Sequence, residues 1–207
     1  MDYRECNDAY NINADYRNVK SIVSEIIKEA GFVSFVGPNC TGKSRMKAYV
    51  RKMLELRGCS VTDWDRDSLY NLLIANGDFP QSLHNVVYQF EMQVFEKLYR
   101  VYPDHTVLYE GTGIRPRWRP NYGLTFGKKS VCLVFDGPLK SIVDRFEKSD
   151  DYYWKDYKSR EDFSLDVNSQ QLRYQWPTSK EGWDRIYYIN TFGEEGENYL
   201  APLLIER

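Results

Sequence analysis

Eight residues in the first quarter of the chain have the spacing of a phosphate-binding loop. The stretch GPNCTGKS, from Gly37 to Ser44, follows the apolar run GFVSFV and precedes a predicted helix. It matches G-x-x-x-x-G-K-[ST], the P-loop, in which backbone N–H groups at a helix N-terminus cradle phosphate oxygens. The other interpretation is a glycine turn that caps a helix. The predicted nucleotide-binding residues are Gly37, Asn39, Cys40, Thr41, Gly42, Lys43, Ser44 and Arg45.

Two side chains of this loop have expected roles in catalysis. Lys43 is expected to reach the β- and γ-phosphates of ATP, and the hydroxyl of Ser44 is expected to bind Mg²⁺. Phosphoryl transfer depends on positioning and charge neutralisation more than on covalent chemistry by the protein. Lys43 is therefore the first predicted catalytic residue.

An acidic segment, VTDWDRDSLY, follows the next predicted strand and contains Asp63, Asp65, Arg66 and Asp67. A carboxylate beside an acceptor hydroxyl can take its proton as the oxygen attacks, and Asp67 is the preferred catalytic base. Aspartate also suits the N-cap of a helix predicted at 67–75, and the two roles are compatible. Asp65 and Arg66 are expected to contact the substrate.

A second acidic position lies in the segment VLYEGTGIRPRW. Glu110 ends a predicted strand, where P-loop enzymes commonly place an acidic residue that holds Mg²⁺ or its water. Ser44 and Glu110 are therefore the predicted metal ligands, and Thr112 is expected to line the substrate pocket. The alternative is a polar strand end followed by a glycine turn.

The residues that follow form a basic, aromatic loop, IRPRWRPNYGLTFGKK. Its two prolines exclude a regular helix. Arginine pairs with phosphate bidentately and aromatic rings stack on bases, so the loop suits an anionic acceptor that carries a base. A solvated basic loop anchored by Trp118 is the other interpretation. The predicted acceptor-binding residues are Arg115, Arg117 and Arg119, with Lys128 and Lys129 in the same loop.

A charged segment further along, RFEKSDDYYWKDYKSR, is a candidate lid within residues 145–168. Its cations are expected to close over the triphosphate and neutralise the transition state, with Arg145 as a catalytic residue. A solvated charged stretch explains the same residues equally well. The cations are Arg145, Lys148, Lys155, Lys158 and Arg160.

The composition limits the classes of protein to consider. The chain has 207 residues, 42% of them apolar, and a net charge of −2, which indicates one globular domain over 1–207 that does not coat nucleic acid non-specifically. Four cysteines without metal spacing, Cys6, Cys40, Cys59 and Cys132, are expected to be reduced thiols. No signal peptide and no run that could span a bilayer is visible, so a cytoplasmic protein without membrane partners is expected.

Predicted helices and strands alternate along the chain. Alternation of this kind requires crossover connections and a mostly parallel sheet with helices on both faces. The fold class is therefore α/β, a three-layer P-loop fold with about five strands and a lid, whose ligands bind beyond the carboxyl ends of the strands. Strands are predicted at 32–36, 59–63, 105–110, 130–136 and 184–190, helices at 19–30, 43–57, 67–75, 82–102, 137–148 and 168–176, and irregular structure at 1–18.

Taken in order, these segments resemble the P-loop polynucleotide-kinase-type phosphotransferases. DWDRDSLY is similar to the segment that carries the family's general base, with Asp67 at the matching position. YEGTG resembles its strand-end D-x-T, with Glu110 in place of aspartate and Thr112 retained. WPTSKEGWDRIYYI is similar to a late segment, in which Pro177, Glu181, Gly182, Trp183 and Asp184 match. The resemblance covers about residues 32–190.

This resemblance implies transfer of the γ-phosphate of ATP, with Mg²⁺, to a hydroxyl on nucleic acid. Polynucleotide 5′-kinases tend to carry an arginine one turn after the base, and this chain has Tyr70 there. Related phage kinases that phosphorylate 5-hydroxymethyluracil in DNA fit equally well. Alternatives are a kinase for nucleosides, nucleoside monophosphates or other small metabolites, and a nucleotide-dependent switch without an acceptor. The chain lacks the N-K-x-D motif that a GTPase would need.

Overall fold

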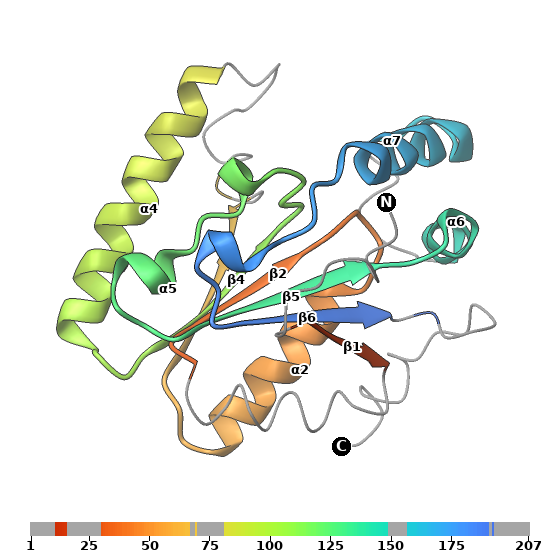
Figure 1. Ribbon diagram of the computed structural model, residues 1–207. Helices are drawn as coiled ribbons and strands as arrows, with labels where there is room; N and C mark the ends of the chain where they lie inside the picture. The colour runs from red at the N-terminus through yellow and green to blue at the C-terminus, as the bar shows by residue number, and fades with distance from the viewer. Residues whose placement is uncertain are drawn as a thin grey trace.

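A parallel sheet forms the centre of the fold (Figure 1). The computed structural model describes residues 11–15, 30–66, 69, 81–148, 157–190 and 192. Within them the sheet has six strands in the order β1-β6-β5-β2-β4-β3, and every neighbouring pair is parallel. The strands are β1 Asn11–Asp15, β2 Phe32–Val36, β3 Val61–Asp65, β4 Thr106–Gly111, β5 Ser130–Asp136 and β6 Arg185–Asn190.

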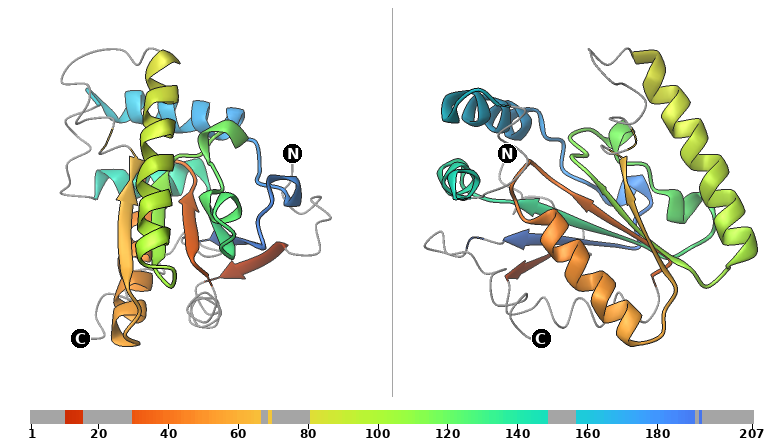
Figure 2. Two further views of the ribbon diagram at one scale, coloured as in Figure 1. Left: turned by 90° about the vertical axis from the view of Figure 1, so that its left-hand side faces the viewer. Right: turned by 180° about the vertical axis from the view of Figure 1, so that it is seen from behind.

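Helices cover both faces of this sheet (Figure 2). Because side chains alternate along a strand, Val33 and Phe35 of β2 pack with α2 Lys43–Leu56 on one face. Phe32 and Val36 point to the other face, where they join residues of α4 Gln81–Val101 and α5 Tyr122–Thr125. The predicted three-layer α/β arrangement is confirmed.

Two further helices lie beyond the carboxyl end of β5 (Figure 1). They are α6 Leu139–Glu147 and α7 Arg160–Arg173, and they share a third apolar cluster. At its centre the rings of Phe146 and Phe163 stack with centroids 3.8 Å apart. This pair of helices therefore stands beside the edge of the sheet where the P-loop lies.

In the described ranges, most predicted elements agree with the structure to within two residues, and two differ by more. The strand predicted at 59–63 runs from Val61 to Asp65, because Cys59 and Ser60 belong to the turn that follows α2. The helix predicted at 168–176 extends over Arg160–Arg173 instead, within a stretch that has no clear period in the sequence. Only Phe163, Val167 and Gln170 of this helix are buried, so its apolar stripe is too sparse to detect.

The prediction of irregular structure at 1–18 is wrong for residues 11–15. They form β1, the sixth strand, which pairs with β6 in parallel register. A polar five-residue segment gives little strand signal, and the backbone of a neighbouring strand supplies the pairing. The other residues of 1–18, the helix predicted at 19–30 apart from residue 30, and most of the helix at 67–75 lie outside the described residues.

Two composition-based expectations concern the cysteines and the membrane. Cys40, Cys59 and Cys132 form no disulfide bond within the described ranges, whereas Cys6 lies outside them. In the portion that the structure describes, no helix combines the length and the apolar character needed to cross a membrane.

Candidate nucleotide-binding site

The backbone of the P-loop adopts a conformation that depends on its glycines. Gly37 has a φ of 143°, and a Cβ atom there would lie 2.1 Å from the carbonyl oxygen of Phe135. Gly42 has a φ of 95° and directly precedes α2. Cys40 also has a positive φ, 57°, which is uncommon for a residue with a side chain. The loop therefore turns tightly from β2 into the N-terminus of α2, as the motif predicts.

Lys43 is folded back over this loop. Its ammonium donates hydrogen bonds to the carbonyl oxygens of Gly37 (2.9 Å) and Pro38 (2.7 Å). The hydroxyl of Thr41 donates to the same Pro38 oxygen at 2.8 Å. The side chain thus places a buried positive charge inside the curve of the loop, where it would meet the phosphates of a nucleotide.

Glu110 lies beside the start of α2 and contacts two of its residues. The Ser44 hydroxyl donates to one carboxylate oxygen of Glu110 at 2.6 Å, and the Lys47 ammonium lies 2.6 Å from the other. A hydroxyl and a carboxylate in contact match the oxygen donors that Mg²⁺ takes from a protein when phosphates supply the rest. Ser44 and Glu110 are therefore the residues that could hold the metal.

The acidic residues of β3 lie in two different places. Asp65 is the register partner of Glu110 across β3 and β4, so it lies at the P-loop edge of the sheet as expected. Asp63 lies within the strand and pairs with Arg51 of α2 at 2.9 Å, away from that edge. Asp67, the predicted base, lies outside the described residues.

Arg66 is buried in a polar network instead of facing a substrate. Its guanidinium pairs with Glu91 of α4 and donates to the hydroxyl of Tyr122 and the carbonyl oxygen of Trp118, both at 3.3 Å. The indole N–H of Trp64 also donates to Glu91, at 2.8 Å. Burial disfavours the charge on Arg66, yet interactions with Tyr109 and Glu91 raise its pKa. The predicted contact of Arg66 with the substrate is corrected to a supporting role.

Arg119 also has a structural role. It is 1% exposed, and two of its nitrogens donate to the two carboxylate oxygens of Glu181 at 2.8 Å each. A third donates to the carbonyl oxygen of Gly113 at 2.6 Å. This bidentate pair joins the loop after β4 to the 3₁₀ turn Ser179–Glu181, so the prediction that Arg119 grips an acceptor conflicts with its burial.

Arg115 is half-buried and precedes a short 3₁₀ turn, Pro116–Trp118, whereas Arg117 is exposed and lies within that turn. Both guanidinium carbons lie over the Trp118 ring, 5.4 and 5.2 Å from its centroid. Neither guanidinium forms a hydrogen bond or an ion pair with any residue in the described ranges. The segment that carries both arginines starts next to the P-loop, because the Thr112 carbonyl accepts a hydrogen bond from the N–H of Gly37. Two available cations and a ring thus lie on the predicted substrate side.

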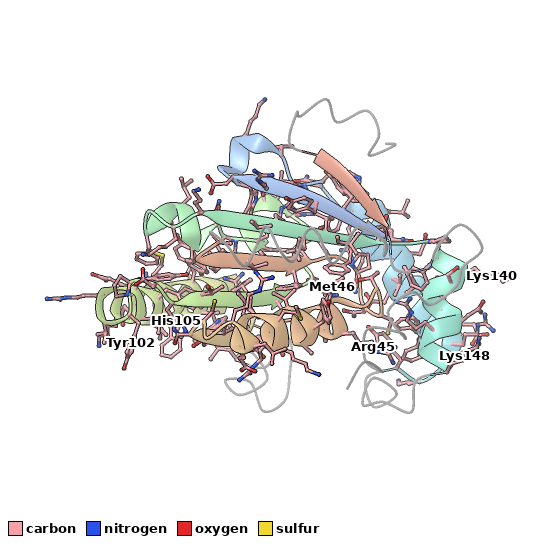
Figure 3. The ribbon with its side chains drawn as sticks, turned by 90° about the horizontal axis from the view of Figure 1, so that it is seen from below. Arg45, Met46, Tyr102, His105, Lys140 and Lys148 are labelled. Carbon is pink, nitrogen blue, oxygen red and sulfur yellow. The ribbon has the colours of Figure 1, made fainter. Side chains whose placement is uncertain are left out.

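Lys128 and Lys129 lie at the opposite edge of the sheet, contrary to the prediction that they belong to the substrate side. They line a hollow of about 900 Å³ together with Tyr102 and His105. Figure 3 shows Tyr102 and His105 at one end of the molecule and Arg45, in the first turn of α2, toward the other. Because β4 and β5 are both parallel to β2, the loop between them must return to the amino edge before β5 begins.

Arg145 of α6 contacts the P-loop directly. One of its nitrogens donates to the carbonyl oxygen of Cys40 at 3.3 Å, and its guanidinium lies 3.7 Å from the centre of the Phe192 ring. Burial and the nearby charge of Arg45 lower the pKa of Arg145 to about 10, so it stays protonated at neutral pH. Arg160 instead pairs with Asp144 and Glu147 on the outside of α6. Residues 149–156 of the predicted lid lie outside the described part.

Sequence reasoning missed several residues that contact this site. Lys47 lies one helical turn after Lys43, and that spacing is a signal that it shares the same face of α2. From α7, Gln170 accepts a hydrogen bond from the backbone N–H of Asn39. Before α7, Tyr157 accepts one from the side chain of Asn39. Neither of these contacts with Asn39 has a recognisable signal in the sequence.

Comparison with known proteins finds similar folds among solved structures. No protein-family model matches the chain, and no curated protein matches its sequence. Among solved structures, Kti12 from Chaetomium thermophilum in complex with ADP-AlF3 is similar, with a TM-score of 0.50, 12% identity, and coverage of 83% of this chain and 94% of Kti12. APE1195 has a TM-score of 0.49 at 12% identity, over 85% of this chain and 93% of its own.

At this identity the likeness to Kti12 concerns the fold alone. It agrees with the parallel sheet and its helices. The glycine loop between β2 and α2 and the buried lysine within that loop are this chain's own features. Together they give the chain the α/β fold of the P-loop class.

Proposed function

We propose that the protein is an ATP- and Mg²⁺-dependent kinase that transfers the γ-phosphate to a hydroxyl on a nucleic acid or nucleotide-like acceptor. The observation that carries the proposal is the arrangement of Lys43, Ser44 and Glu110 at the edge of the sheet where the segment with Arg115 and Arg117 begins. These two arginines lie over the Trp118 ring and could bind a second anion. A hydrolytic switch has no need of that second group. In Kti12 the fold holds ADP-AlF3, which supports an adenine nucleotide as donor.

Each residue has a defined role in this reaction. Lys43 and the loop N–H groups bind the β- and γ-phosphates, and Arg145 supports the loop at Cys40. The acceptor oxygen forms a bond to the γ-phosphorus as the bond to the ADP oxygen breaks, and Asp67 takes the acceptor's proton. Ser44 and Glu110 would hold Mg²⁺, which would supply charge neutralisation at the phosphate oxygens.

A transfer assay tests the proposal. Labelled ATP is offered with single-stranded oligonucleotides, hydroxymethylated DNA, nucleosides and nucleoside monophosphates in turn and in competition. We expect label on an oligonucleotide. Label on a monophosphate alone would indicate a small-metabolite kinase instead. ATP turnover without label on any acceptor would indicate a nucleotide-dependent switch.

Arg115 and Arg117 are expected to bind the acceptor. Changing both to glutamine removes two charge-assisted contacts, so the KM for the acceptor should rise by about ten- to a hundredfold. The kcat and the KM for ATP should change little, because neither residue contacts the donor. Steady-state kinetics measure both values, with Arg100→Gln, an exposed change on α4, as control. An unchanged acceptor KM would contradict the assignment.

Lys47 is expected to weaken metal binding, because its ammonium neutralises the carboxylate of Glu110. In Lys47→Met, the affinity for Mn²⁺ in the presence of ADP should rise by about tenfold, since a competing positive charge is gone. Titration followed by the electron paramagnetic resonance of free Mn²⁺ measures it. Lys52→Met, an exposed change on the same helix, is the matched control. Weaker Mn²⁺ binding in Lys47→Met would show that Lys47 instead holds Glu110 in place for the metal.

A further inference from the structure

Helix α7 carries two consecutive glutamines that attach it to the nucleotide site. The side-chain N–H groups of Gln171 donate to Asp136 and to the carbonyl oxygen of Gly137, both at 2.8 Å. The side-chain oxygen of Gln170 accepts a hydrogen bond from the backbone N–H of Asn39 in the P-loop at 3.2 Å. The helix is thus fixed both to the end of β5 and to the loop expected to hold the phosphates.

Gln170 belongs to a closed ring of hydrogen bonds. Its amide nitrogen donates to Asp166, one turn earlier on α7, at 2.8 Å. The Tyr157 hydroxyl donates to the same Asp166 oxygen at 2.6 Å and accepts from the side chain of Asn39 at 3.3 Å. Gln170 is 6% exposed, so this ring holds its amide oxygen against the loop in one orientation.

The backbone N–H of Asn39, which donates to Gln170, lies where the outermost phosphate is expected. In a P-loop the lysine reaches the β- and γ-phosphates, whereas the N–H groups at the helix end cradle the inner ones. The Lys43 ammonium lies against the carbonyl oxygens of Gly37 and Pro38, the two residues before Asn39. The β- and γ-phosphates are therefore expected on the side of the loop that includes the Asn39 N–H.

We propose that Gln170 is a specificity-determining residue whose amide oxygen occupies the position of an outer oxygen of a nucleoside triphosphate. This inference rests on the proposed function, since it assumes that the loop binds a nucleotide. An amide oxygen and a phosphate oxygen accept the same hydrogen bond, so only one of them can use this N–H at a time. A diphosphate leaves the contact intact, whereas a triphosphate must displace Gln170.

Displacement of Gln170 by the γ-phosphate couples nucleotide binding to the position of α7. When the γ-phosphate takes the Asn39 N–H, the ring loses one of its four hydrogen bonds, and α7 is held to the loop less tightly. Because coupling between two sites is reciprocal, whatever holds α7 in place weakens triphosphate binding by the same factor. Gln170 thereby reduces the preference of the site for triphosphate over diphosphate.

Paired nucleotide affinities of the full chain test this inference. Calorimetric titrations with ADP and with a non-hydrolysable ATP analogue, both with Mg²⁺, compare the wild type with two variants. In Gln170→Ala the affinity for the analogue should rise about fivefold, the value of one neutral hydrogen bond, while that for ADP stays within about twofold. In Gln170→Glu the competing oxygen gains a full negative charge, so analogue affinity should fall about fivefold or more.

The opposite signs separate specificity from stability, because a merely structural role would lower analogue affinity in both variants. Asn168→Ala, an exposed change on the same helix, is the control, and Gln170→Met replaces Gln170→Ala if the alanine variant does not fold. Unchanged or weaker analogue binding in Gln170→Ala overturns the inference while the proposed function stands. A wild-type chain that binds neither nucleotide overturns both.

Discussion

Replacing Lys43 with methionine should lower the rate of phosphoryl transfer by about a hundred- to a thousandfold, the largest functional effect expected of any described residue. The ammonium is held inside the curve of the loop by direct contact with the carbonyl oxygens of Gly37 and Pro38. Methionine keeps most of the volume of lysine, so the buried space stays filled while the charge is lost.

The measurement separates binding from folding. Transfer is followed with labelled ATP, and nucleotide affinity by titration with a fluorescent ADP analogue. Because the carbonyl oxygens of Gly37 and Pro38 lose a donor, a modest fall in thermal stability accompanies the loss of activity. Lys52→Met on the exposed side of α2 should behave as wild type. Transfer at the wild-type rate by the Lys43 variant would refute the role assigned to this lysine.

The parts of this site that the sequence predicted are those whose geometry is local. The P-loop specifies its own conformation, because Gly37 and Gly42 take positive φ values and the next residue, Lys43, opens a helix. Glu110 was predictable in the same way, since a residue at the end of a strand beside β2 must lie next to the loop. The second inference needs only the general rule that the carboxyl ends of parallel strands meet at one edge of the sheet, and no particular side-chain partner.

The assignments of Arg66 and Arg119 to substrate binding conflict with the structure because burial depends on distant partners. The sequence presents Arg115, Arg117 and Arg119 as one basic cluster, yet only Arg119 meets Glu181, which lies 62 residues away. Arg66 is withdrawn from the surface in the same manner by Glu91, 25 residues further along. Periodicity reports which residues share a face of one element, but not which carboxylate another element will bring there.

The misplacement of Lys128 and Lys129 was avoidable. A parallel sheet obliges each connection to cross from the carboxyl edge back to the amino edge, so residues just before β5 could not lie beside residues just after β4. The contacts of α7 with the P-loop, in contrast, could not be predicted, because they depend on how a helix with few buried residues is placed.

The largest expected effect on stability concerns Glu91. Its side chain is fully buried and accepts hydrogen bonds from Arg66, Trp64 and Tyr122. Changing Glu91 to alanine leaves a buried guanidinium without its counter-ion, so the free energy of unfolding should fall by about 3–5 kcal/mol. Urea denaturation measures the change, and Glu96→Ala, an exposed change on the same helix, should stay within about 0.5 kcal/mol of wild type.

A double variant identifies the cause of that loss. Replacing a buried ion pair by apolar residues of similar volume is often close to neutral, so Arg66→Met together with Glu91→Met should recover most of the stability lost in Glu91→Ala. The double variant should nevertheless bind the acceptor less well, because Arg66 also donates to the backbone carbonyl oxygen of Trp118. The side-chain ring of the same Trp118 lies beneath Arg115 and Arg117. Restored stability with an unchanged acceptor KM would mean that the Arg66–Glu91 pair only stabilises the fold. Contacts with α4 would then make no contribution to acceptor binding.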